Sequence, residues 1–284
     1  MSDSCFRLTI DLESHERSIG DEYLRVVEQL LEELATRGIR ATFFVNGTAI
    51  ASEIGKRLVT KISRLSHEIG SHGHQHCPLR LHSPTTFAAD IRRSRDELSQ
   101  IAAKDVVGYR APYFSLTRKT LWASQVINES GFIYSSSTIP ALNPQSGFPG
   151  LPRRPFKWQS GLIEFPVPVI GLRQLALPLL GGGYFRLLPK ILAPVLRSWQ
   201  LRSGDTWTYL HPYDLSNSIP VHSETDPTRL MHLLLRVNRT SSLAKYLSLL
   251  SATESTFADL ANDFTYSRLL KQFVPDDQSV HGIC

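Results

Sequence analysis

Features that would mark several protein classes are scarce in this chain of 284 residues. Its only cysteines, Cys5, Cys77 and Cys284, are too few and too widely spaced for a disulfide framework or a four-cysteine zinc site. No apolar run reaches about 18 residues, so no segment is expected to span a membrane. Residues 1–7 lack the basic and apolar stretches of a signal peptide, and we therefore expect a reducing, cytoplasmic location.

Composition and charge are those of an ordinary globular protein. Hydrophobic residues make up 42% of the chain and charged residues 20%, enough for a large core. The length suits one large α/β barrel or two modest domains. A net charge of +5 suits an anionic partner or membrane surface, but solubility alone also accounts for it, and no nucleic-acid partner is expected.

Short apolar segments alternate along the chain with amphipathic ones. This order of strand and helix predicts right-handed crossover units and a parallel sheet or barrel. A proline- and glycine-rich stretch, 139–155, is expected to form a long surface loop. We predict strands at 6–12, 41–45, 68–72, 106–109, 132–137, 162–168 and 206–210, and helices at 23–36, 49–66, 84–103, 116–130, 188–200, 227–237 and 242–250.

Residues capable of chemistry follow several of the predicted strands. Asp11 and Glu13 end the first strand, and period-two alternation places both side chains on one side. Arg110 and His211 end two later strands. Because the carboxyl ends of parallel strands share one mouth, these side chains are expected to converge there.

The segment 70–76 carries three histidines at alternate positions. His72 and His76 lie four residues apart, a spacing that lets both point at one metal ion from a helical turn or a tight loop. His74 would face elsewhere and is expected to be structural, like Cys77. Taken alone, such a pair is more often an exposed polar turn; the other strand-end residues favour a metal site.

Together these motifs resemble the NodB-homology polysaccharide deacetylases, carbohydrate esterase family four, over residues 6–215. The segments Gly183 to Pro189 and Tyr209 to Pro212 are similar to the branch associated with bacterial O-antigen and exopolysaccharide loci. The resemblance implies a distorted (β/α) barrel of fewer than eight strands. We expect a single domain, 1–270, with a C-terminal helical extension, and a disordered tail at 271–284.

The resemblance also implies a divalent metal, most often Zn²⁺, held by one carboxylate and two histidines with one position open to water. His72 and His76 match the two histidine ligands. Asp11 matches the general base and Glu13 the carboxylate ligand, although Asp11 itself remains an alternative ligand. A metal ion with three protein ligands and one position open to water is suited to hydrolysis.

Further roles are implied by the same resemblance. Arg110 would hold Asp11 ionised, the backbone N–H of Tyr113 would face the oxyanion, and His211 would protonate the leaving amine. The family usually has Ser or Thr where this chain has Gly73. The carboxylate that orients the acid histidine is missing from its usual region, which leaves Asp214 as a substitute.

These roles predict a metal-dependent deacetylase that hydrolyses the acetamide of an N-acetylated sugar in cell-envelope polysaccharide or O-antigen biosynthesis. The substrate is expected to be nucleotide- or lipid-linked, with Trp207, Tyr184 and Asp214 near it. Alternatives are hydrolysis of a non-sugar amide or formamide, and a carbohydrate-binding protein whose catalytic site has decayed. The basic helix at 188–202 makes peripheral membrane contact a further possibility. The sequence does not indicate an oligomeric state.

Overall fold

The computed structural model describes residues 5–13, 20–143, 146–172, 176–202, 204–218, 237–250, 255–266 and 270–274. The strands are β1 (Phe6–Leu12), β2 (Thr42–Val45), β3 (Glu68–Ser71), β4 (Gly108–Tyr109), β5 (Tyr134–Ser135), β6 (Phe156–Trp158), β7 (Ile163–Glu164), β8 (Thr206–Leu210) and β9 (Gln272–Phe273). The α-helices are α1 (Asp21–Thr36), α2 (Glu53–Arg64), α3 (Pro84–Ala102), α4 (Trp122–Glu129), α5 (Gly182–Leu187), α6 (Ala193–Leu201), α8 (Ser242–Leu247) and α9 (Phe257–Tyr266). The 3₁₀ turns are η1 (Leu79–Leu81), η2 (Pro112–Phe114), η3 (Arg118–Thr120), η5 (Lys190–Leu192) and η6 (Pro212–Asp214).

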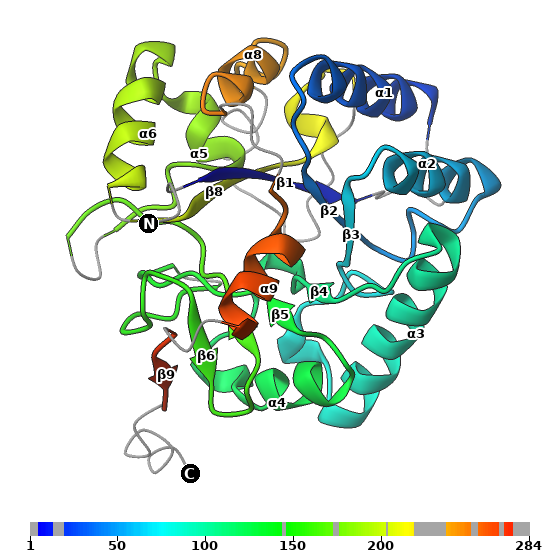
Figure 1. The fold of residues 1–284 in the computed structure, drawn as a ribbon, viewed down its shortest axis with the longest axis vertical. Coiled ribbons are helices and arrows are strands. Elements are labelled where there is room, and N and C mark those ends of the chain that lie inside the picture. Colours follow the sequence, from blue (N-terminus) through cyan, green and yellow to red (C-terminus); the bar gives the residue numbers. More distant parts are fainter. Residues whose placement is uncertain are drawn as a thin grey trace.

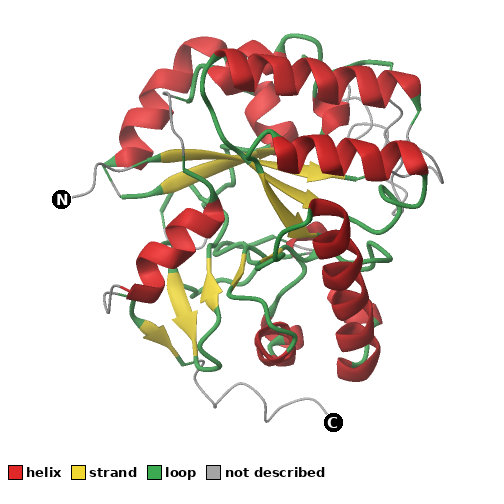
Figure 2. Cartoon of the chain, turned by 45° about the vertical axis from the view of Figure 1, so that its right-hand side comes forward, coloured by secondary structure: helices red, strands yellow, loops and turns green. Residues whose placement is uncertain are grey.

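The strands form one open sheet in the order β8-β1-β2-β3-β4-β5-β7-β6-β9. The run from β8 to β7 is parallel throughout, whereas β6 pairs antiparallel with β7 and parallel with β9. Helices α1 to α4 lie around the outside of this curved sheet (Figures 1 and 2). The predicted distorted (β/α) barrel of fewer than eight strands is thus confirmed for the parallel run, which β6 and β9 extend.

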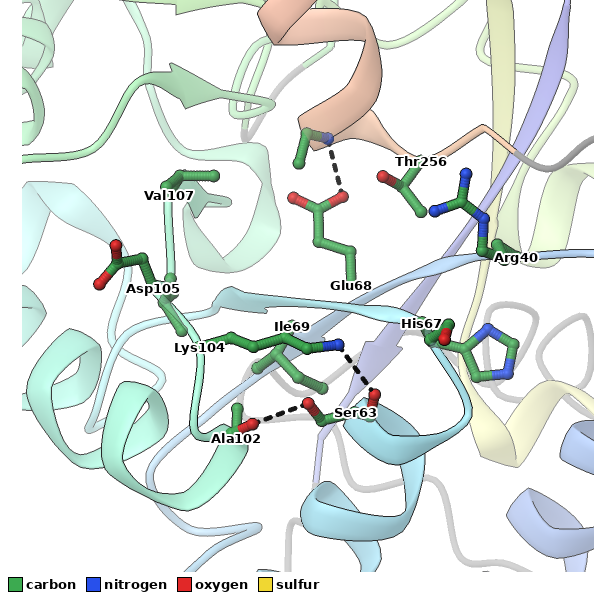
Figure 3. A pocket seen from close by; sticks show the side chains of 13 residues that line it. Arg40, Ser63, His67, Glu68, Ile69, Ala102, Lys104, Asp105, Val107 and Thr256 are labelled. Atoms are coloured by element: carbon green, nitrogen blue, oxygen red, sulfur yellow. Dashed lines mark hydrogen bonds between the residues drawn. The ribbon is translucent and has the colours of Figure 1, made fainter.

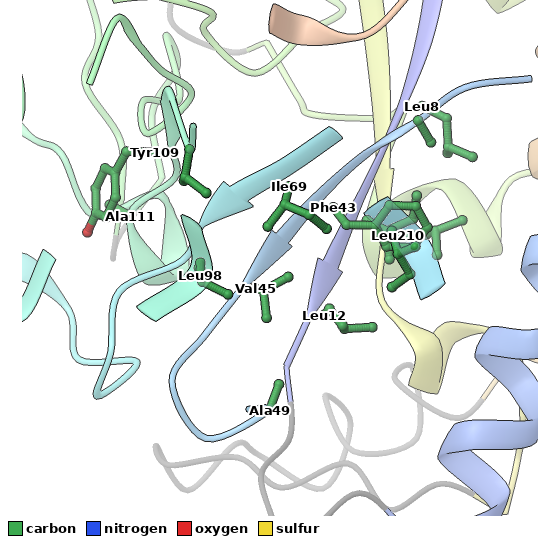
Figure 4. Close-up of a cluster of buried hydrophobic side chains, with 14 of the residues drawn as sticks. Leu8, Leu12, Phe43, Val45, Ala49, Ile69, Leu98, Tyr109, Ala111 and Leu210 are labelled. Atoms are coloured by element: carbon green, nitrogen blue, oxygen red, sulfur yellow. The ribbon is translucent and has the colours of Figure 1, made fainter. Parts of the chain in front are cut away.

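Side-chain alternation along the strands separates two apolar layers. Leu8 and Leu12 of β1 and Phe43 and Val45 of β2 point toward the surrounding helices, as Figure 4 shows. Their neighbours in sequence point into the barrel, where Phe44 belongs to a second cluster of aromatic and aliphatic side chains. Because helix-facing and interior positions alternate, Thr9 and Asp11 fall on the interior side of β1.

The helices pack against the barrel through apolar residues at helical spacing. Six residues of α1 at helical spacing are buried: Tyr23, Val26, Val27, Leu30, Leu31 and Leu34. Helix α3 starts at a capping box, in which the Ser83 hydroxyl accepts from the Thr86 backbone N–H and the Thr86 hydroxyl accepts from that of Ser83. These features fix α3, which in turn supports the histidine segment described below.

Helix α9 covers the amino-terminal end of the barrel (Figure 1). The backbone N–H of Ala258 donates to Glu68 Oε2 at 2.9 Å, and the Tyr134 hydroxyl donates to Glu68 Oε1 at 2.6 Å. A cavity of about 180 Å³ opens beside Glu68, His67 and Arg40 (Figure 3). Two residues of its lining contact α9: Glu68 accepts from Ala258, and Arg40 pairs with Asp259 at 3.1 Å.

Some predicted elements differ in extent. The strand predicted at 162–168 shortens to β7, and β6 forms next to it from a stretch with no predicted element. The helix predicted at 227–237 lies almost wholly outside the described residues, as does most of the segment predicted as a tail. The described part of that segment includes β9, which pairs with β6. Among the described residues, no helix combines the length and apolarity needed to cross a membrane.

Candidate metal and catalytic site

Glu13, His72 and His76 converge at the carboxyl end of the parallel strands. Glu13 Oε1 lies 3.0 Å from His72 Nε2 and 3.0 Å from His76 Nε2. All three side chains are buried, and their ligand atoms form one of two candidate metal groups among the described residues. Two ligand atoms bound to one ion at ~2.1 Å lie roughly 3.0–3.5 Å apart, so this spacing fits a shared ion.

The hydrogen bonding of His72 gives independent support for a cation. Its Nδ1 lies 2.8 Å from the carbonyl oxygen of Arg110, an atom that can only accept, so Nδ1 carries the proton. In the neutral ring, Nε2 then directs a lone pair at the Glu13 carboxylate. Two acceptors facing each other at this distance require a proton or a cation between them. The donor set of two imidazoles and one carboxylate therefore fits a divalent metal.

The histidine segment is a tight loop, not a helical turn. Asp90 of α3 accepts from the backbone N–H of His74 at 2.8 Å and of Gln75 at 3.0 Å. Gly73 has φ of 75°, a left-handed conformation that favours glycine, and an added Cβ would lie 3.2 Å from Asp90 Oδ2. This explains the departure from Ser or Thr at Gly73. It also explains why His74 points elsewhere, toward Glu97 at 3.5 Å.

Asp11 is held by Arg110 inside the barrel. Arg110 Nη1 donates to Asp11 Oδ1 at 2.5 Å and to the Thr9 hydroxyl at 2.9 Å, and both Asp11 and Arg110 are buried. Arg110 thus serves both halves of the site: its guanidinium fixes Asp11, while its carbonyl oxygen fixes the ring of His72. Lysine offers no such fork of donors.

The Arg110 guanidinium is also surrounded by aromatic rings. It lies 4.1 Å from the ring centroid of Phe44 and 4.7 Å from that of Trp207. Trp207, expected near the substrate, is only 4% exposed and forms part of this lining. That expectation fails because β8 is buried on both faces, so the ring has no face open to a sugar.

A run of hydroxyls after β5 supports Arg110 from the other side. Ser136 accepts from Arg110 Nη2 at 3.2 Å, and Ser137 accepts from the backbone N–H of Ala111 at 2.8 Å. Glu164 of β7 anchors this run by accepting from the Ser137 backbone N–H at 2.7 Å and the Thr138 hydroxyl at 2.9 Å. Sequence reasoning missed Glu164; its position inside an apolar strand was the available signal.

His211 lies across Glu13 from the histidine pair. Its Nε2 is 3.7 Å from Glu13 Oε1 and 3.8 Å from Asp11 Oδ2, and its side chain is 13% exposed. Asp214 lies three residues later, and its Oδ2 accepts from the His211 backbone N–H at 2.8 Å and lies 3.0 Å from His211 Nδ1. The Tyr213 ring stacks on the imidazole with centroids 4.5 Å apart. The side chain of Asp214 therefore orients the ring.

The charges around His211 determine its protonation. Burial alone lowers the pKa of His211, but the carboxylates of Glu13, Asp214 and Asp11 raise it overall to about 9. Burial favours the neutral form of Asp214, yet the hydrogen bond and charge of His211 and the charge of Arg186 hold the pKa of Asp214 below its usual value. Arg186 Nε lies 3.0 Å from Asp214 Oδ1, a buried ion pair that sequence reasoning missed.

Tyr113 and Tyr184 border the site. Tyr113 adopts a left-handed backbone with φ of 59°, and its ring lies 5.2 Å from that of His76. A non-glycine residue in this conformation is uncommon and is often found at functional turns. Tyr184, on α5, is exposed, as a residue facing a substrate must be. Asp214, also expected near the substrate, is buried behind His211.

This arrangement defines an α/β barrel with a candidate metal centre, which is flanked by the carboxylate of Asp11 and the imidazole of His211. Residues 8–131 match the family model described as polysaccharide deacetylase. Residues 136–273 match a second model, described only as a domain of unknown function, DUF3473. Of the site residues, those from Asp11 to Tyr113 thus fall in the first match, and His211 and Asp214 fall in the second.

The chain is also similar to individual proteins in sequence and in structure. A chitin deacetylase from Pestalotiopsis sp is 32% identical over 88 residues, which cover 31% of this chain and 30% of that relative's length. A protein described as a polysaccharide deacetylase from Mycobacterium smegmatis aligns with a TM-score of 0.59 at 16% identity, covering 96% of this chain and 94% of its own. PuuE allantoinase aligns with a TM-score of 0.57 at 13% identity, covering 94% and 92%. The family matches support the predicted polysaccharide deacetylase resemblance, and the structures support the fold.

Proposed function

We propose that this protein is a metal-dependent deacetylase that removes the acetyl group from an N-acetylated sugar. The observation that carries the proposal is the single oxygen, Glu13 Oε1, that lies 3.0 Å from the Nε2 atoms of both His72 and His76. Asp11 and His211 flank this group as a base and an acid would. The polysaccharide deacetylase match over residues 8–131 supports the same reaction class.

Glu13, His72 and His76 are the residues that would hold the ion, with zinc the most suitable metal for two imidazoles and one carboxylate. Asp11 is the less suitable ligand, because Oδ1 is already engaged by Arg110 at 2.5 Å. When bound, a divalent ion would polarise the acetyl carbonyl and lower the pKa of a water molecule.

Asp11 acts as the general base in this proposal. It accepts a proton from the attacking water, and Arg110 keeps the carboxylate aimed at the mouth of the barrel. The guanidinium itself is fixed by Thr9 and Ser136, so little reorientation is needed during the reaction. The backbone N–H of Tyr113, in the turn next to His76, would donate to the oxyanion as negative charge develops on the acetyl oxygen.

His211 acts as the general acid. An amine leaves poorly as an anion, so its nitrogen must receive a proton as the carbon–nitrogen bond breaks. The nearby carboxylates, Asp214 among them, raise the pKa of His211 and so favour its protonated form, and Asp214 holds Nδ1 so that Nε2 faces the site. Asp214 thereby takes the place of the orienting carboxylate that the sequence lacks in its usual region.

The substrate in this proposal is an N-acetylated glycan or sugar, carried by a nucleotide or a lipid, in a cell-envelope polysaccharide or O-antigen pathway. A cytoplasmic location would suit such an intermediate. The enzyme should be tested on N-acetylglucosamine oligomers, nucleotide-linked and lipid-linked N-acetyl sugars, and a non-sugar amide such as allantoin. Acetate release from the sugars alone would support the proposal, and turnover of the non-sugar amide alone would contradict it.

The site assignment has a matched control within the histidine loop. His72→Ala should abolish acetate release, whereas His74→Ala should retain it, because His74 points toward Glu97 and not toward Glu13. Circular dichroism would verify that both variants fold. Equal activity of His72→Ala and wild type would refute the metal-site assignment, and so would loss of both activities together with retained folding.

A further inference from the structure

An exposed apolar stripe runs along η5 and α6. Ile191, Val195 and Trp199 are 81%, 63% and 46% exposed, and their spacing of four places them on one face of this continuous helical segment. Leu192 and Leu187 beside them are also exposed, and the surface continues to Tyr184 on α5. Helix α6 lies at the periphery of the molecule (Figure 1), so its outer face has no element packed on it among the described residues. Contiguous exposed apolar surface of this kind marks an interaction site.

The stretch of sequence that contains the stripe carries charge of one sign. Between residues 165 and 204 the chain contains five basic residues and no acidic residue. Two of the five, Lys190 and Arg202, are exposed at opposite ends of η5 and α6. Asp205, the first acid that follows, is paired with Arg7 at 2.6 Å. An apolar stripe with cations at both ends is complementary to an anionic lipid surface, where apolar side chains enter the interface and cations meet headgroups.

We infer that η5 and α6 form a docking surface for an anionic membrane. A second copy of this chain is a poorer occupant, because a symmetric contact across the stripe would bring Lys190 and Arg202 of both copies together. Trp199 is suited to the headgroup region, since its ring is apolar while its N–H seeks a polar partner.

The docking surface is tied directly to the candidate site. Helix α5 leads into η5, and Arg186 on the buried face of α5 lies 3.0 Å from Asp214, the residue that orients His211. Gly181 and Gly182 pack against the Tyr209 ring, where an added Cβ would lie 2.1 Å and 3.1 Å from ring atoms. Exposed Tyr184 belongs to the same helix, α5. Resting on the proposed function, this placement assigns the substrate class: a glycan attached to a lipid carrier at the bilayer surface.

Vesicle flotation tests the surface without reference to catalysis. Wild-type protein should float with vesicles of equal parts phosphatidylcholine and phosphatidylglycerol at low salt, and remain unbound to phosphatidylcholine alone. The triple variant I191E/V195E/W199E should bind at least about tenfold more weakly, because three acids replace apolar contacts and oppose the anionic surface. The matched control I54E/L65E changes two exposed apolar residues on and beside α2 and should bind like wild type.

The outcomes separate this inference from the proposed function. Absence of wild-type flotation at low salt, or equal flotation of the triple variant, would overturn the docking surface whatever the enzyme activity. A wild-type dimer that the triple variant dissociates in analytical ultracentrifugation would also overturn it in favour of a second copy. Acetate release from a lipid-linked N-acetyl sugar dispersed in detergent, where no bilayer is present, should be the same in the triple variant and wild type, and its absence from both would contradict the proposed function alone.

Discussion

Replacement of Asp214 by asparagine is the sharpest perturbation of the acid side of the site. Asp214 accepts from the His211 backbone N–H and faces His211 Nδ1 with one oxygen, and it faces Arg186 Nε with the other. Asparagine has a single carbonyl oxygen, so its NH₂ group must face either His211 or Arg186, both of which are donors. The shape of the side chain is retained while its charge and one acceptor are lost.

The expected effect on rate follows from the pKa of His211. That pKa is raised to about 9 by Glu13, Asp214 and Asp11 acting against burial. A general acid works in its protonated form, so activity should fall as pH rises through this pKa. An ion held by Glu13 would offset the charge of that carboxylate, so the fall in activity on the alkaline side of the pH–rate profile, the alkaline limb, should lie below pH 9. Loss of the Asp214 charge should lower the limb by a further ~1–2 pH units.

The assay is the pH dependence of kcat for acetate release, measured with wild type, Asp214→Asn and the exposed control Asp96→Asn on α3. We expect Asp214→Asn to lower kcat about 10- to 100-fold at pH near 8 and to shift the alkaline limb downward. The free energy of unfolding of Asp214→Asn, measured by thermal unfolding, should be roughly 2–4 kcal/mol lower than that of wild type, because the buried Arg186 loses its counter-ion. An unchanged limb in a folded variant would refute the role of Asp214, and a shift of the same size in Asp96→Asn would show that the effect is nonspecific.

Three further perturbations test the buried framework. Arg110→Lys should lower kcat about 10- to 100-fold while metal content stays at the wild-type level, because lysine cannot contact Asp11 and its two hydroxyl partners together; wild-type kcat would contradict this. Burial raises the pKa of Glu164 above the usual 4.5 despite its hydrogen bonds. Its contribution to the free energy of unfolding is therefore lost as the pH rises above 4.5. Glu164→Gln should reduce this pH dependence of the free energy of unfolding, measured by urea titration at several pH values. Burial, with a smaller effect of Arg40, lowers the pKa of His67 from 6.5 to about 4. The free energy of unfolding of wild type should therefore decrease by ~3 kcal/mol as the pH falls through this range, and His67→Leu should remove this decrease.

Strand periodicity and strand-end chemistry were enough to predict most of the framework. The boundaries predicted for β1 and β8 match the structure, because each is a compact β-rich segment bounded by polar residues. The convergence of Asp11, Arg110 and His211 follows from the rule that parallel strands share a carboxyl end. The spacing of His72 and His76 left open whether they lay on a helix or a loop, and Asp90 on α3 decides this by fixing a loop.

Long-range polar contacts account for what the sequence could not predict. Arg186 and Glu164 act through partners 28 and 27 residues away, in Asp214 and Ser137, and no local pattern connects them. Trp207 was predicted near the substrate because aromatic rings often bind sugars. Its burial depends on the interior cluster that β8 forms with α9, where the Trp207 and Phe257 ring centroids are 5.4 Å apart.

In the proposed function, Glu13 binds the metal and Asp11 accepts the proton, and these two roles can be separated by one paired measurement. Metal content and acetate release should be determined on the same preparations of wild type, Glu13→Gln and Asp11→Asn, with folding verified by circular dichroism. We expect about one divalent ion in wild type, loss of both ion and activity in Glu13→Gln, and an inactive Asp11→Asn that keeps its ion. A folded Glu13→Gln that retains the ion, or an Asp11→Asn that loses it, would contradict the assignment.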